Sequence, residues 1–205
     1  MWKGLIVEKP HITLFVGRKG SGKTVLLIKL LKDVDGFRGH YEEIIIVSPT
    51  FKLQKVWQQL SPEGITVYES FSDSVLEKIY KEQQPGVSTL LILDDNGEDL
   101  RKVSPSVFNK LISNSRHLNC SIIALLQKLS QAPTILRSNA DVFIVFSACS
   151  VRERDALHSE IGTVDKKTFE KMFNECTSEQ YSAFVASIID GKIGFYKNFE
   201  NEIKI

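Results

Sequence analysis

The stretch ITLFVGRKGSGKTVLLIK, residues 12–29, joins three kinds of local sequence. Ile12 to Val16 is a short apolar run of β-branched and aromatic residues, which is typical of a strand. Gly17 to Thr24 fits the pattern G-x-x-x-x-G-K-[ST] at every fixed position. An apolar run that continues to Leu31 then predicts a helix that begins near Gly22. The order strand, glycine-rich loop, helix predicts a phosphate-binding loop.

The residue types of this loop suit an anion. Glycines let the backbone curl so that successive N–H groups point at one phosphate, and the N-terminus of the helix adds a positive dipole. Lys23 is expected to reach the β- and γ-phosphates, and the Thr24 hydroxyl to ligate Mg²⁺. The predicted nucleotide site comprises eight consecutive residues: Gly17, Arg18, Lys19, Gly20, Ser21, Gly22, Lys23 and Thr24.

Length and composition indicate an ordinary globular protein. With 205 residues, 42% of them hydrophobic and 25% charged, a single domain over residues 1–205 is the simplest division. A formal net charge of +1 means that any contact with nucleic acid needs a local basic surface. The spacings of Cys120, Cys149 and Cys176 fit neither a zinc site nor a disulfide framework, so a reducing compartment fits, and Cys120 and Cys149 are expected to be buried.

The apolar start of the chain does not read as a signal peptide. Lys3, Glu8 and Lys9 interrupt it, and no apolar run approaches the roughly 20 residues that cross a bilayer. We therefore expect no membrane-spanning segment, and a protein located inside a cell or carried in a particle.

Apolar runs alternate with amphipathic segments along the chain. Near-continuous runs at 43–47, 90–93, 121–126 and 142–146 predict strands buried on both faces of a parallel sheet, with a further short strand at 65–68. Helices are expected at 51–60, 74–82, 105–115, 133–138, 150–161 and 166–174, and an edge strand from Trp2, Leu5 and Ile6. Residues 181–187 and 193–196 flank Asp190-Gly191, which predicts a C-terminal β-hairpin. The pattern predicts an α/β fold of three layers around a mainly parallel central sheet.

Two carboxylates follow the apolar run 90–93. A buried strand places Asp94 at its carboxyl end, beside the phosphate loop, where the side chain can hold Mg²⁺ directly or through water. Asp95 can then orient or activate the water that attacks the γ-phosphate. A strand that ends in a solvated acidic turn is the alternative.

The order of the remaining motifs indicates which branch of nucleotide-binding proteins the chain resembles. The run 43–47 lies between the phosphate loop and Asp94, and the sheet continues through 121–126, which suggests the additional-strand branch of P-loop NTPases. No N-K-x-D guanine-binding motif is present, so ATP is the expected nucleotide. Gln127 follows the strand 121–126, where its amide can bond the attacking water or the γ-phosphate; a polar strand-end residue is the alternative.

Arginines and lysines suggest subunit and DNA contacts. A ring ATPase needs an arginine from the neighbouring subunit; Arg116 is the first candidate and Arg137 the second, while a surface ion pair is the alternative for each. Basic residues near the expected active face can follow a phosphate backbone, or form an ordinary solvated face. They are Lys52, Lys55, Arg101, Lys102 and Lys128.

Several segments together resemble a known family. They are LLILDDNGEDL at 90–100, SRHLNCSII at 115–123, Gln127, and APTILR at 132–137. They resemble the genome-packaging ATPases of poxviruses, other large DNA viruses and virophages, within the FtsK–HerA superfamily of DNA translocases. The resemblance runs from about residue 12 to about residue 161; residues 163–205 are placed only weakly.

The resemblance implies a RecA/FtsK-like ATPase that drives double-stranded viral DNA into a preformed capsid. It implies a homo-oligomeric ring, pentamer or hexamer, contact with capsid vertex proteins, and a location in the virion or the infected host cytoplasm. By position, Lys23 and Thr24 become the phosphate and Mg²⁺ ligands, Asp94 the Mg²⁺ acid, Gln127 the sensing amide and Arg116 the trans-acting arginine. Asp95 stands where glutamate is common, which puts its role as general base in question. Such a short chain leaves no room for a fused nuclease.

Two other functions remain open on the sequence. A small-molecule or nucleotide kinase needs an arginine-rich lid, for which Arg137, Arg152 and Arg154 are available. A regulatory module would bind nucleotide to control assembly without turnover, and the acidic pair and Gln127 argue against it.

Overall fold

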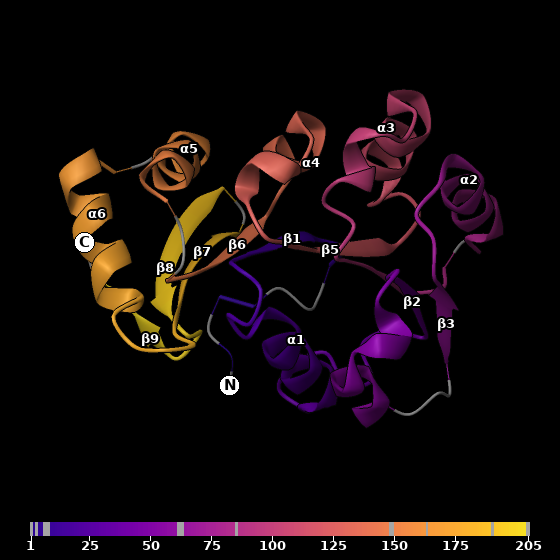
Figure 1. The fold of residues 1–205 in the computed structure, drawn as a ribbon, viewed down its shortest axis with the longest axis horizontal. Coiled ribbons are helices and arrows are strands. Elements are labelled where there is room, and N and C mark those ends of the chain that lie inside the picture. The colour runs from indigo at the N-terminus through magenta and orange to yellow at the C-terminus, as the bar shows by residue number, and fades with distance from the viewer. Residues whose placement is uncertain are drawn as a thin grey trace.

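The computed structural model describes residues 2, 4–5, 9–60, 64–84, 86–147, 150–162, 164–189 and 191–203, without the side chains of Arg101 and Ile189. Within these ranges, all strands join one nine-stranded sheet in the order β3-β2-β4-β5-β1-β6-β7-β8-β9 (Figure 1). The first six strands of this order are mutually parallel, and β7, β8 and β9 continue it antiparallel. The prediction of a mainly parallel α/β fold with a C-terminal hairpin is confirmed.

The strand bounds follow the apolar runs of the sequence closely. The parallel part contains β3 (Ile65–Tyr68), β2 (Glu43–Val47), β4 (Thr89–Asp94), β5 (Cys120–Leu126), β1 (Ile12–Val16) and β6 (Val142–Phe146). The antiparallel part contains β7 (Ala183–Ile189), β8 (Lys192–Lys197) and β9 (Asn201–Glu202). Because β5 lies between β1 and β4, the sheet has the additional strand that the sequence suggested.

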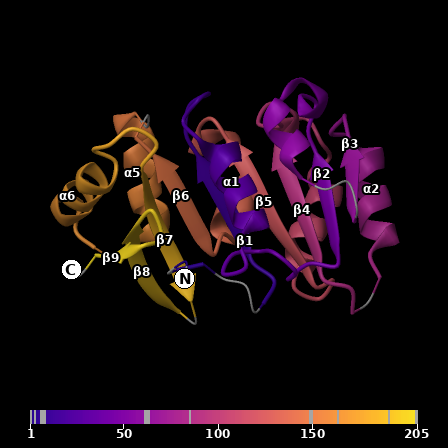
Figure 2. The same ribbon diagram turned by 90° about the horizontal axis from the view of Figure 1, so that it is seen from below.

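Helices cover both faces of the sheet unequally. One face carries α1 (Lys23–Lys32) together with the 3-10 turns η1 (Phe51–Leu53) and η2 (Lys55–Gln59), seen in front of the sheet in Figure 2. The other face carries five helices: α2 (Asp73–Glu82), α3 (Pro105–Asn114), α4 (Thr134–Ser138), α5 (Val151–Ile161) and α6 (Lys166–Cys176) (Figure 1). Short 3-10 turns η3 (Asp99–Arg101) and η4 (Leu129–Gln131) follow β4 and β5.

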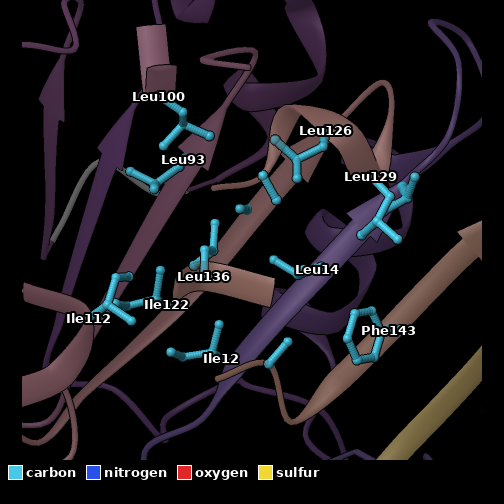
Figure 3. Packing of buried hydrophobic residues seen from close by; sticks show 14 of the residues in the cluster. Ile12, Leu14, Leu93, Leu100, Ile112, Ile122, Leu126, Leu129, Leu136 and Phe143 are labelled. Carbon is cyan, nitrogen blue, oxygen red and sulfur yellow. The ribbon is translucent and has the colours of Figure 1, made fainter. Parts of the chain in front are cut away.

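Successive side chains of each strand point to opposite faces of the sheet, which divides the core into two layers. On β1, Leu14 packs in the layer under the five helices, whereas its neighbour Phe15 packs in the layer under α1. Figure 3 shows the first layer, where Leu14 and Ile122 of the sheet lie near Leu136 of α4. Every residue of β1, β4, β5 and β6 is buried, as expected for strands covered on both faces.

Two local predictions are wrong, and one short strand was missed. Residues 51–60 form two 3-10 turns and not one α-helix, because the backbone is extended at Gln54, whose side chain bonds Thr50 and Asp94. Trp2 and Leu5 pack on the α1 layer without forming an edge strand, since Trp2 contacts Phe199 edge-on; Ile6 lies outside the described residues. The short strand β9 was not predicted.

Two further predictions concern single residues. Tyr181 does not open a strand: its φ of 66° is incompatible with extended backbone, and β7 begins at Ala183. Cys120 is buried as predicted, while Cys149 lies outside the described residues. Among the described helices, none is long and apolar enough to cross a membrane.

Candidate nucleotide-binding and hydrolysis site

The glycine-rich loop connects the carboxyl end of β1 to α1, and its glycines are sterically required. A Cβ atom on Gly17 would lie 2.6 Å from Ser21 Oγ and 2.9 Å from Phe146 Cβ. Gly20 and Gly22 adopt φ angles of 78° and 101°, which glycine accepts without strain. The Gly17 N–H donates to the Leu126 carbonyl at 3.0 Å, so the loop is fixed to β5 as it leaves β1.

Lys23 and Thr24 open α1 and both line a cleft of about 890 Å³. Lys23 Nζ donates to the carbonyls of Gly17 at 2.6 Å and Arg18 at 3.1 Å, so the ammonium lies across the loop. Burial lowers the pKa of Lys23, and the negative charges of Asp94 and Asp95 oppose that shift. The positive charge of Lys23 and the two carboxylates therefore lie close together in this cleft.

Asp94 ends β4 and is buried. Its Oδ2 atom accepts hydrogen bonds from Ser48 Oγ at 3.3 Å, Gln54 Nε2 at 3.2 Å and Trp57 Nε1 at 3.2 Å. Oδ1 has no donor among the described residues. Burial raises the pKa of Asp94 and the adjacent Asp95 raises it further, while the Trp57 and Ser48 donors and Lys23 lower it.

Asp95 and Gln127 meet above the ends of β4 and β5. Gln127 Nε2 donates to Asp95 Oδ1 at 3.2 Å, and both side chains are exposed to the cleft. Asp95 has a φ of 59°, a conformation that Asp tolerates better than most residues. Gln131 Oε1 accepts from the backbone N–H groups of Gln127 and Lys128 at 2.9 and 3.0 Å, which fixes the turn that carries Gln127.

The donor set fits Mg²⁺ bound with a nucleotide. Mg²⁺ is usually held by one or two protein oxygens together with phosphates and water, so a large protein cluster is not required. Thr24 and Asp94 line the same cleft, and Asp94 has Oδ1 available while Oδ2 is held in place by its three donors. When bound, Mg²⁺ would neutralise charge on the β- and γ-phosphate oxygens.

The family described as "Poxvirus A32 protein" matches residues 3–195. The chain belongs to the poxvirus A32 protein family. This confirms the predicted membership of the viral packaging ATPases and makes the chain an ATPase of the P-loop class. No curated protein sequence matches the chain.

Solved structures similar to this A32 family member include packaging proteins of Sulfolobus turreted icosahedral viruses. The genome packaging NTPase B204 of Sulfolobus turreted icosahedral virus 2 in complex with AMP has a TM-score of 0.67 at 22% identity, covering 91% of this chain and 96% of that one. Its complex with AMPPCP has a TM-score of 0.65 at 23% identity, covering 91% and 97%. The DNA-packaging ATPase B204 of Sulfolobus turreted icosahedral virus has a TM-score of 0.67 at 19% identity, covering 96% and 98%. At these identities the likeness establishes the fold.

The candidate arginines of this A32 family member lie away from its own phosphate loop. Arg116 precedes β5 and pairs with Asp141 at 3.1 Å, at the amino ends of the parallel strands. Roughly 13 Å of strand β1 separates that end from the loop. Arg137 bonds Glu160 at 2.9 Å and the Ala132 carbonyl at 3.3 Å. The Arg116 side chain is 72% exposed and that of Arg137 only 24%, so Arg116 is the freer of the two.

The predicted basic residues gather at the carboxyl edge of the sheet, in the segments that follow β2, β4 and β5. Lys52 pairs with Glu69 at 2.6 Å, and Lys102 pairs with Asp99 at 3.3 Å. The four basic residues whose side chains are described are all exposed. The exposed set is Lys52, Lys55, Lys102 and Lys128; the Arg101 side chain is outside the described part of the protein.

Several residues of the site were not predicted. Ser48, Gln54 and Trp57 hold Asp94, and Asn96 Nδ2 bonds the carbonyls of Val47 at 2.6 Å and Asp94 at 3.0 Å. The sequence offered one usable signal, because polar Ser48 directly follows the fully apolar run 44–47 at the carboxyl end of a neighbouring strand. Gln54 and Trp57 carry no comparable signal, since their contacts depend on the fold of the 51–59 segment.

Proposed function

We propose that the protein is an ATP-hydrolysing motor that translocates double-stranded viral DNA into a preformed capsid. In this proposal Lys23 and the loop 17–24 bind ATP, Thr24 and Asp94 hold Mg²⁺, and Asp95 with Gln127 positions the attacking water. The subunits act as a ring, pentamer or hexamer, in the virion or the infected host cytoplasm, and Arg116 completes the active site of a neighbouring subunit.

The observation that carries the hydrolysis step is the contact between Asp95 and Gln127. Their 3.2 Å hydrogen bond joins the ends of two adjacent strands beside the phosphate loop. A carboxylate and an amide at that point can orient one water molecule in line with the terminal phosphate. The positive φ of Asp95 and its place in the cleft lining support this role for the shorter carboxylate.

The proposed partners follow from the position of the basic residues and from relatives. Lys52, Lys55, Lys102 and Lys128 lie at one edge of the sheet, where a ring would gather several copies along a DNA backbone. The B204 proteins carry the descriptions "genome packaging NTPase" and "DNA-packaging ATPase", and B204 has been seen with AMPPCP and ATP-gammaS. These relatives support ATP as the ligand and DNA as a partner, while capsid vertex proteins enter the proposal through the preformed capsid that the motor would fill.

The test is ATP hydrolysis with and without long double-stranded DNA, in the presence and absence of capsid vertex proteins. We expect DNA to stimulate turnover, and Lys23→Ala and Asp95→Asn to reduce it by roughly 10²–10⁴-fold. An Asp95→Asn protein that still binds ATP would place the loss in chemistry. Hydrolysis that does not change with DNA, whether or not vertex proteins are added, would refute the motor.

The alternatives of a kinase and a regulatory module receive less support. A kinase lid needs mobile arginines, but Arg137 pairs with Glu160 at 2.9 Å and Arg154 with Glu170 at 3.2 Å between helices of one layer. Transfer of labelled phosphate to a nucleoside monophosphate would nevertheless identify a kinase. Absence of hydrolysis in the assembled state would identify a regulatory module.

A further inference from the structure

The cleft beside the phosphate loop continues past the loop to the C-terminal hairpin. At one end it is lined by Asp94, Asp95 and Gln127. At the other end it is lined by Tyr181, which precedes β7, and Asn198, which follows β8. Neither residue has a role in phosphate or metal binding, so this half of the cleft needs its own explanation.

The strand order gives the direction of a nucleotide in the cleft. The phosphate-loop strand β1 lies between β5, on the side of the acidic strand β4, and β6, on the side of the hairpin. A terminal phosphate near Asp95 and Gln127 therefore lies on the β5 side of the loop. The nucleoside at the other end of the phosphate chain then lies toward β6 and β7, where Tyr181 and Asn198 are.

Tyr181 offers an aromatic ring beside the loop. A Cβ atom placed on Gly22 would lie 3.4 Å from Tyr181 Cδ1, so the ring borders the phosphate loop itself, and the residue is 61% exposed. Its turn is fixed by the Ser182 hydroxyl, which donates to the Glu179 carbonyl at 2.6 Å, and by the Lys197–Glu179 pair at 2.7 Å. A large exposed ring on a fixed turn is suited to stacking on a flat ligand.

Asn198 offers a hydrogen-bond donor. Its Oδ1 accepts from the Ala183 N–H at 2.8 Å, which leaves Nδ2 without a protein acceptor among the described residues. Of the five described non-glycine residues with positive φ, three line this one cleft: Asp95, Tyr181 and Asn198. Such backbone angles cost free energy and gather at ligand sites.

We propose that the C-terminal hairpin forms the base half of the nucleotide site. Tyr181 stacks on the purine ring of ATP, and Asn198 Nδ2 donates to a ring nitrogen. This inference rests on the proposed function, because it takes ATP as the ligand of the loop. It assigns a role to Tyr181 and Asn198, which lie in the stretch 163–205 that the sequence left without one.

The experiment compares ATP with inorganic tripolyphosphate, each with Mg²⁺, by calorimetric titration of the full chain. Tyr181→Gly removes the ring, and glycine accepts a φ of 66° without strain, so the turn is kept. We expect the Kd for ATP to rise roughly 5- to 100-fold and the Kd for tripolyphosphate to stay unchanged. Tyr181→Phe keeps the ring and should recover most of the ATP affinity. Tyr68→Ala, a tyrosine on β3 at the far edge of the sheet, is the control for loss of an aromatic side chain elsewhere.

The outcomes separate this inference from the proposed function. If the unaltered protein binds ATP no more tightly than tripolyphosphate, or if Tyr181→Gly leaves ATP binding unchanged, the base site is refuted while the phosphate site stands. If Tyr181→Gly weakens both ligands equally, the residue supports the loop, and the base site is again refuted. If the unaltered protein binds neither ligand, the proposed function fails and the base site fails with it.

Discussion

At the scale of single residues, Asp94 carries a buried charge that the protein holds at a cost. Burial is the largest influence on its pKa and raises it above the ordinary value of 3.8. The folded protein therefore binds this proton more tightly than the unfolded chain does. As the pH rises through 3.8, Asp94 loses its proton in the unfolded chain before it does so in the folded protein. The folded state therefore loses stability until the pH passes the pKa of Asp94 in the folded protein.

This predicts that Asp94→Asn is more stable than the unaltered protein at pH 7 without nucleotide. The amide keeps an acceptor oxygen for Trp57 and the neighbouring donors but carries no charge. The melting temperature should rise at pH 7, and the gain should disappear below pH 3.8, while Mg²⁺-dependent turnover falls by roughly 100-fold or more. Glu98→Gln, which removes an exposed charge nearby, is the control and should leave the melting temperature unchanged. Lower stability of Asp94→Asn at pH 7 would contradict the argument.

The sequence predicted the residues of the site better than it predicted the residues that hold them in place. The loop 17–24, Asp94, Asp95 and Gln127 were all expected from the sequence, and the fold brings them into one cleft. Each of them ends or directly follows a buried strand, and parallel strands in one sheet end at a common edge. Trp57 was expected on a helix, because its spacing from Val56 and Leu60 fits a helical pattern as well as a 3-10 turn.

At the scale of secondary-structure elements, the segment that connects β2 and β3 is hydrogen-bonded to Asp94, the proposed metal ligand. All three donors to Asp94 Oδ2 come from it: Ser48, Gln54 and Trp57. The same segment exposes Lys52, Lys55 and Leu53 at the edge of the sheet. A change at Asp94 on metal binding would therefore act directly on a basic surface segment.

Trp57→Phe tests that connection. Phenylalanine keeps a buried ring but removes the Nε1–H donor, so the change should cost about 1.5–3 kcal/mol of the free energy of unfolding, the range for a hydrogen bond to a charged group. In an Asp94→Asn background the same change should cost only about 0.5–1.5 kcal/mol. Urea unfolding of the four proteins gives the coupling directly. An equal cost in both backgrounds would assign the loss to packing of the indole ring.

Strands with a continuous apolar run could be predicted from the sequence, whereas a strand that forms only by pairing with a neighbouring strand could not. β1, β4, β5 and β6 are buried throughout, so sequence and burial agree. β9 has two exposed residues, Asn201 and Glu202, and exists only because β8 offers an edge to pair with. No local pattern could reveal it.

At the scale of the whole molecule, the residues to which the proposed function assigns hydrolysis lie at opposite ends of the parallel strands. The carboxyl ends hold the loop, the acidic pair and Gln127, while Arg116 lies at the amino ends and pairs with Asp141. One subunit cannot bring Arg116 to its own phosphate loop across the sheet. A head-to-tail ring, in which each interface joins two different surfaces, can bring it to a neighbour's loop.

Mixing two inactive proteins tests action across that interface. Asp95→Asn subunits lack the carboxylate proposed to position the attacking water but keep Arg116, and Arg116→Ala subunits have the reverse defect. In rings of equal and random composition, about one quarter of interfaces pair an intact acid with an intact arginine, so turnover should return to about one quarter of that of the unaltered ring. Arg116→Ala alone should bind ATP normally, because the arginine side chain is 72% exposed and Asp141 keeps its hydrogen bond from the Ile12 N–H. The same experiment with Arg137→Ala tests the second candidate. If the Arg116→Ala mixture stays inactive while the Arg137→Ala mixture recovers, the trans-acting arginine is Arg137. If neither mixture recovers although mixed rings form, neither arginine acts in trans.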